Sequence, residues 1–167
     1  MTVQGSVDCV WSLMEAIKIA MVITHDGPGD HLRARPMAAH PAREENAIYF
    51  LTDVAAGKIS EINHNDNVCL AFADVAGQRF VSVTGEASVS SDRDKIRQLW
   101  SINEKAFWSD DADPAIRVLR VAPDNAEYWQ SPGTVVSAVR MIVAGLTGGE
   151  ARLHDNQTAS LSPAHRE

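Results

Sequence analysis

The chain has few of the residues that would mark a secreted or membrane-spanning protein. Among its 167 residues are two cysteines, Cys9 and Cys69, with no CxxC pair. Two are too few for a disulfide framework and fit thiols kept reduced in the cytoplasm. The longest apolar run, residues 19–23, is far too short to span a bilayer, and the N-terminus lacks the basic and apolar regions of a signal peptide. We therefore expect a cytoplasmic protein without a membrane partner.

Positive charge is also scarce, with 15 Lys and Arg against 22 Asp and Glu, for a net charge of −7. A domain that binds nucleic acid is usually basic, so a nucleic-acid partner is not expected, although a local basic pocket for an anionic ligand is compatible with this charge. The six histidines form no HxH or HExxH pair, and the chain has no P-loop and no GxSxG. We predict no metal site, and no catalytic residue can be named.

What is present favours a mainly β domain with peripheral helices. Apolar residues make up 45% of the chain and charged residues 22%, as in ordinary globular proteins. Turn-forming residues separate six short segments that are apolar or alternate in polarity, which predicts a six-stranded antiparallel sheet closed or split as a barrel. The expected strands are 19–24, 31–39, 47–52, 67–74, 79–90 and 115–123, and the expected helices are 7–18, 55–63, 92–100 and 134–146.

Three details of this prediction concern irregular positions. The apolar residues of 79–90 change parity along the segment, which indicates a β-bulge near Gly85. Residues 125–133 are predicted to form a turn region. We expect residues 1–148 to form the domain and 149–167 to be a polar tail that adds one short strand near Ala159.

The most informative stretch runs from Leu32 to Lys58. Arg33 and Arg35 are two residues apart in a predicted strand and so point to the same face. Thr52 and Lys58 flank a turn of small residues, and the helix that opens there leaves backbone N–H groups free. Guanidinium, hydroxyl, N–H groups and ammonium together predict a phosphate-binding site.

Five motifs in order resemble one known family. They are Arg35-Pro36-Met37, IYFLTD at 48–53, GKISEI at 57–62, DRDKIRQLW at 92–100 and AEYWQSP at 126–132. Together, across residues 7–148, they resemble the pyridoxamine 5′-phosphate oxidase-like FMN-binding split barrels, in particular the general stress protein 26 branch.

The resemblance implies a homodimer of split barrels with FMN at the subunit interface. It implies that Arg35 and Lys58 contact the flavin phosphate and that Trp129 reaches the flavin ring. The remaining positions predicted to contact the cofactor are Pro36, Met37, Leu51, Thr52 and Gly57.

Departures from the family pattern predict a weaker site. This chain reads Ala56-Gly57-Lys58 where the oxidases read Ser-Arg-Lys, so the cation expected at Gly57 is missing. Phe80 stands where the oxidases offer a glutamine to the flavin. An Arg-x-His motif occurs at Arg152 and His154, but it lies so far after Trp129 that a solvated tail is the preferred interpretation. Oxidation of pyridoxamine phosphate itself is therefore not expected.

Three functions remain open. The first is an FMN-dependent oxidoreductase that acts on a small flat substrate. The second is a flavin-binding stress or sensor protein without turnover, and the third is a deazaflavin-dependent reductase on the same barrel. Haem, which a C-terminal histidine would bind, is not expected. Trp108 is an open position, because an aromatic residue there could cover the flavin, the partner subunit or the mouth of the barrel.

Overall fold

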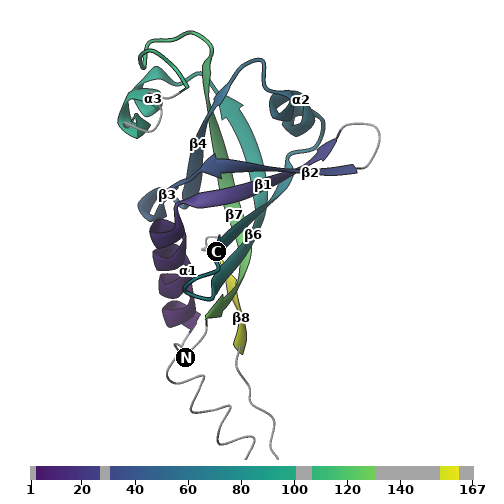
Figure 1. The fold of residues 1–167 in the computed structure, drawn as a ribbon, viewed down its shortest axis with the longest axis vertical. Helices are drawn as coiled ribbons and strands as arrows, with labels where there is room; N and C mark the ends of the chain where they lie inside the picture. The colour runs from purple at the N-terminus through teal and green to yellow at the C-terminus, as the bar shows by residue number, and fades with distance from the viewer. Residues whose placement is uncertain (1–2, 27–30, 101–106, 131–154, 162–167) are drawn as a thin grey trace, which may run out of the picture.

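The computed structural model describes residues 3–26, 31–100, 107–130 and 155–161. Within these ranges an antiparallel sheet forms most of the molecule, with three α-helices around it (Figure 1). The elements in chain order are α1 (Val3–Ile17), β1 (Ile19–Asp26), β2 (His31–Ala38), β3 (His40–Ala42), the 3-10 helix η2 (Arg43–Glu45), β4 (Ala47–Asp53), α2 (Gly57–His64), β5 (Asn67–Asp74), β6 (Arg79–Ser90), α3 (Arg93–Leu99), β7 (Ile116–Gln130) and β8 (Asp155–Ser160).

The sheet has the order β2-β1-β5-β6-β7-β4-β3, and β8 pairs with the second half of β7. In the described part of the chain, β2 and β4 are not hydrogen-bonded neighbours, so the sheet stays open between them. The prediction of a mainly β, antiparallel split barrel is confirmed. The sheet holds eight strands rather than six, because residues 40–42, which lie between two predicted strands, pair with β4, and the short strand predicted near Ala159 joins β7.

The prediction that a turn follows residue 123 is wrong, because β7 continues to Gln130. Pro123 lacks an N–H and lies opposite Gly85, while Asn125 lies opposite Thr84, so the strand takes up its turn-like residues as a bulge. The bulge predicted near Gly85 is thereby confirmed. Glycine is required there, because a Cβ on Gly85 would lie 2.2 Å from the carbonyl oxygen of Ala122.

Two apolar cores lie on opposite faces of β4. The first joins α1 to the inner face of the sheet and buries Met14, Phe50 and Phe72 almost completely. The second lies beneath α3 and consists of Ala47, Tyr49, Leu51, Ile96, Ile116 and Val118. Because successive side chains of a strand point to opposite faces, β4 is buried on both sides, which explains its continuous apolar sequence.

Other boundaries differ little from the predicted ones. The strands β5 and β6 have the predicted ends. The helix α3 is capped by Asp92, whose side chain accepts hydrogen bonds from the backbone N–H groups of Asp94 and Lys95, both at 3.0 Å. The helix predicted over 134–146 lies outside the described residues. None of the described helices is long and apolar enough to cross a membrane.

Candidate functional site

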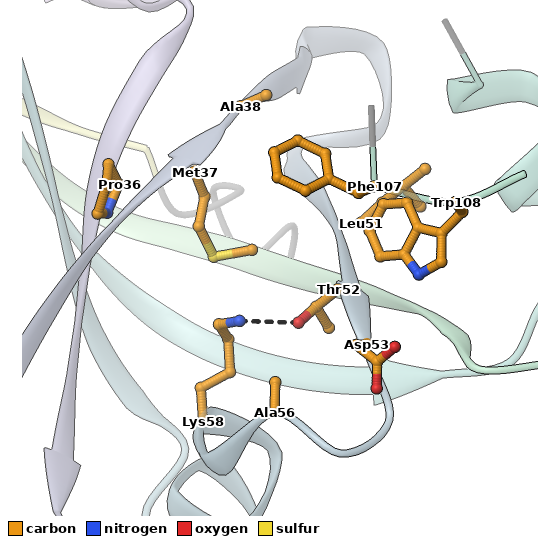
Figure 2. A pocket seen from close by; sticks show the side chains of 10 residues that line it. All are labelled: Pro36, Met37, Ala38, Leu51, Thr52, Asp53, Ala56, Lys58, Phe107 and Trp108. Atoms are coloured by element: carbon orange, nitrogen blue, oxygen red, sulfur yellow. Dashed lines mark hydrogen bonds between the residues drawn. The ribbon is translucent and has the colours of Figure 1, made fainter. Parts of the chain in front are cut away.

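A cavity of about 270 Å³ lies at the opening between β2 and β4 (Figure 2). Most of its lining is apolar, with one described ammonium group, one hydroxyl and one carboxylate. The lining residues are Pro36, Met37 and Ala38 of β2, Leu51, Thr52 and Asp53 of β4, Ala56 and Lys58 at the start of α2, and Phe107 and Trp108. We call this cavity the β2–β4 pocket.

The polar end of the pocket is built by Thr52 and Lys58. Thr52 shares the face of β4 that carries Ile48 and Phe50, and it is only 3% exposed. Lys58 is the second residue of α2, and its Nζ donates a 2.8 Å hydrogen bond to Thr52 Oγ1. The short turn between β4 and α2 therefore brings a hydroxyl and an ammonium group together beside an apolar cavity.

The charge of the Lys58 ammonium is only partly offset by nearby carboxylates. Burial lowers its pKa most, and the positive charge of Arg35 lowers it further, while Glu61 and Asp53 act in the opposite direction. An amine whose pKa is lowered in this way gains stabilisation when an anion enters beside it. The electrostatics of the pocket therefore favour an anionic ligand group at Lys58.

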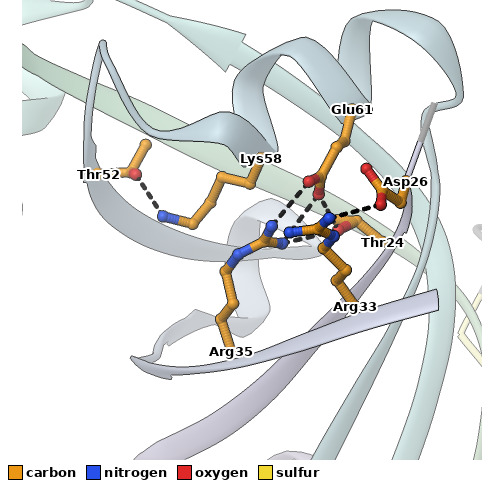
Figure 3. A network of polar contacts seen from close by, with 7 residues as sticks. All are labelled: Thr24, Asp26, Arg33, Arg35, Thr52, Lys58 and Glu61. Carbon is orange, nitrogen blue, oxygen red and sulfur yellow. Dashed lines mark hydrogen bonds and ion pairs between the residues drawn. The ribbon is translucent and has the colours of Figure 1, made fainter. Parts of the chain in front are cut away.

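Arg35, which was predicted to contact the flavin phosphate, is paired with a carboxylate in the structure. Its guanidinium donates to both carboxylate oxygens of Glu61, at 2.8 and 2.7 Å, and to Thr24 Oγ1 at 3.1 Å (Figure 3). Thr24, which is fully buried, in turn donates a 2.5 Å hydrogen bond to Glu61. Arg35 does not line the pocket in this structure, and its charge is paired with Glu61, so it acts on the pocket at a distance, through the pKa of Lys58.

Glu61 is the residue that sequence reasoning missed. It is 7% exposed, and the Arg35 guanidinium is the main cause that holds the pKa of its carboxyl below the usual range. A usable signal was its position three residues after Lys58, which places both side chains on the same side of α2. Arg33, by contrast, forms an ion pair of 2.7 Å with Asp26 at the rim, where its side chain is 57% exposed.

The other positions that the sequence singled out differ in where they lie relative to the pocket. Gly57 is the first residue of α2, and a Cβ there would lie 3.8 Å from its nearest neighbour, Glu61 Oε1, so the backbone does not require glycine. Trp129 lies on β7 directly opposite Phe80 of β6 and is not among the described residues that line the pocket. Trp108, whose role the sequence left open, does line it. Arg152 and His154 lie outside the described residues.

No group of three or more His, Cys, Asp or Glu side chains that could hold a metal ion occurs in the described ranges. The described lining of the pocket combines an ammonium group and a hydroxyl with an apolar surface.

Comparison of the sequence with known proteins identifies its family. The family model for proteins described as pyridoxamine 5′-phosphate oxidase like matches residues 5–152, which include every residue that lines the pocket. A curated relative, the protein bli-3 of Neurospora crassa, is 28% identical over 150 residues, covering 83% of this chain and 71% of the relative.

Solved structures share the fold. A Clostridium acetobutylicum protein described as related to general stress protein 26 superposes with a TM-score of 0.68 at 17% identity, covering 96% of each chain. A Xanthomonas citri protein described as a general stress FMN/FAD binding protein superposes with a TM-score of 0.63 at 22% identity, covering 74% of this chain and 87% of that one. With the family model extending over most of the sequence, this chain belongs to the pyridoxamine 5′-phosphate oxidase-like family.

Proposed function

We propose that this chain binds FMN in the β2–β4 pocket and acts as a flavin-dependent oxidoreductase on a small, flat substrate. The observation that carries the proposal is the Lys58 ammonium, held by Thr52 at one end of an otherwise apolar cavity. The family is flavin-related, and one structural relative is described as FMN/FAD binding. Bound FMN would supply the electron transfer, while the protein supplies position and electrostatics.

The described residues fit the two chemical halves of this cofactor. Lys58 and Thr52 offer an ammonium group and a hydroxyl to the phosphate, and the N-terminus of α2 adds a favourable dipole. Pro36, Met37 and Leu51 offer apolar surface to the ring. Phosphate binding raises the pKa of Lys58 towards its ordinary value, because the dianion replaces missing solvation.

The test is a comparison of FMN with riboflavin, which has the same ring and no phosphate. We expect FMN to bind about tenfold or more tightly, the effect of one charge-assisted contact. Equal affinity for the two flavins would mean that the phosphate makes no favourable contact in the proposed site. Preferential retention of a deazaflavin would favour the reductase alternative, and bound FMN without NAD(P)H oxidation across a panel of acceptors would favour the sensor alternative.

A second copy of this chain is the proposed partner. On the outer face of the sheet, Met21 lies opposite both Pro36 and Ala71, and Ile19 shares its face. Ile19 is 51% exposed and Met21 36%, which is unusual for large apolar side chains on one strand. The register places Phe80 and Trp129 on this same face. A homodimer formed through the outer face would cover these side chains.

Replacing Met21 with glutamate is expected to convert the dimer to a monomer, because a buried unpaired carboxylate is costly at an apolar interface. Light scattering coupled to gel filtration measures the change. Val75→Glu is the matched control, because Val75 is 76% exposed in the turn between β5 and β6. If wild type and Met21→Glu have the same mass in solution, the outer face is not the interface.

Adding the missing cation should strengthen FMN binding. The space around Gly57 admits a side chain, so Gly57→Arg is expected to tighten FMN binding by about 1 kcal/mol and to leave riboflavin unaffected. Gly57→Ala is the control for the backbone effect alone. An equal gain for both flavins, or no gain with the arginine, would mean that the phosphate does not lie near the start of α2.

A further inference from the structure

The wall of the pocket that faces β2 is aromatic and comes from a segment that the proposed function has not used. Phe107 and Trp108 line this wall, in the chain between α3 and β7 (Figure 2). Trp108 is partly buried against the second core, where Leu51 also lies, so its indole rests on a fixed apolar support. Phe107 is 79% exposed and has no comparable packing.

The rings of Phe107 and Trp108 contact each other without stacking face to face. Their centroids are 5.9 Å apart and their planes are tilted by 56°, so they do not stack face to face. Aromatic side chains dominate contact energies where they meet another flat ring, in offset-stacked or edge-to-face arrangements. An exposed phenyl group beside a supported indole, both lining one cavity, therefore presents two ring surfaces to a ligand.

Trp129 does not offer such a surface within the same chain. It pairs with Phe80 across β6 and β7 and does not line the pocket. The pocket instead has an anion-binding end at Lys58 and Thr52 and an aromatic wall at Trp108, all from one chain.

We propose that Trp108, together with Phe107, contacts the flavin ring, and that the subunit that holds the phosphate also supplies these two residues. This inference rests on the proposed binding of FMN. It assigns the ring contact to the α3–β7 connection rather than to Trp129, and it makes Phe107 a side chain that ligand binding covers.

The test uses the fluorescence of bound flavin, which an indole in contact with the ring quenches by electron donation. Trp108→Phe keeps an aromatic surface but removes the efficient donor, so bound FMN is expected to become several-fold more fluorescent. Trp129→Phe is the matched control, and Trp100→Phe, in the second core but not in the pocket lining, is a second control. Neither control is expected to change the fluorescence of bound FMN.

Affinities provide an independent readout. Phe107→Ala alters an exposed side chain and so does not threaten folding, and it is expected to weaken FMN and riboflavin by the same factor, about three- to tenfold. A phosphate contact would instead affect FMN alone.

The outcomes separate this inference from the proposal on which it rests. If wild-type protein binds FMN but Trp108→Phe leaves the flavin fluorescence unchanged, or if Trp129→Phe raises it instead, the ring contact is not Trp108. If Phe107→Ala leaves both affinities unchanged, Phe107 has no part in the site. If wild type binds neither FMN nor riboflavin, the proposed function itself is overturned together with the inference.

Discussion

Replacing Glu61 with alanine is expected to lower the free energy of unfolding by about 3 kcal/mol. The change leaves the Arg35 guanidinium without its bidentate carboxylate partner and the buried Thr24 hydroxyl without its acceptor. Breaking a fully buried ion pair costs about 3–5 kcal/mol. The lower end applies here because the Arg35 side chain is 28% exposed and water partly replaces its partner. Urea denaturation measures the effect, with Glu44→Ala as a control at an exposed position in η2.

The same ion pair predicts how stability depends on pH. The folded protein lowers the pKa of Glu61 from its ordinary 4.5, so the stabilising contribution is complete above that value and is lost as the pH falls through the folded-state pKa. The difference in unfolding free energy between wild type and Glu61→Ala should therefore be constant near neutrality and should shrink in acid. A difference that persists unchanged in acid would mean that packing, rather than the ion pair, accounts for the loss.

Replacing Lys58 with alanine is expected to weaken FMN binding by about 1–3 kcal/mol, or roughly five- to 150-fold, while riboflavin binding stays the same. The change removes the described ammonium group that lines the pocket. Titration calorimetry with both flavins measures it. Lys58→Arg retains the charge and should keep most of the preference for FMN. Lys95→Ala makes the same charge change where the lysine is paired with Glu45, outside the pocket, and should leave both affinities unchanged.

A pH titration gives an independent check on Lys58. Burial and Arg35 lower the pKa of Lys58 in the protein without ligand. Once the pH exceeds that lowered pKa, Lys58 must take up a proton when FMN binds. The affinity for FMN should therefore be highest at lower pH, within the range where the phosphate is a dianion, and should fall in alkali. Lys58→Ala should abolish this dependence. Riboflavin should show no such dependence with either protein.

Local patterns in the sequence predict much of the fold and part of the site. The continuous apolar run of β4 reflects burial on both faces, and its last residues place Leu51 and Thr52 at the pocket. The change of parity in β6 indicates the bulge at Gly85. The continuation of β7 was missed because Pro123, Asp124 and Asn125 are typical of a turn, and only the pairing with β6 makes them a bulge.

The polar contacts of the site join residues that are far apart in the sequence, and local sequence patterns do not predict such contacts. Arg35 and Glu61 are 26 residues apart, and the arginine is equally suited to a phosphate and to a buried carboxylate. The sequence alone could not decide between these partners. Likewise, Trp108 and Trp129 are both plausible ring contacts by residue type, and only the arrangement of the strands places Trp108 in the pocket.

We claim that the β2–β4 pocket holds FMN, and the visible absorption spectrum after reconstitution shows whether it does. Purified protein is incubated with excess FMN, desalted by gel filtration and scanned beside Lys58→Ala treated in the same way. We predict that wild type retains oxidised-flavin absorbance in stoichiometric amount and that the variant loses most of it. Wild type that emerges without flavin absorbance, or that retains a deazaflavin in preference to FMN when offered both, would contradict the claim.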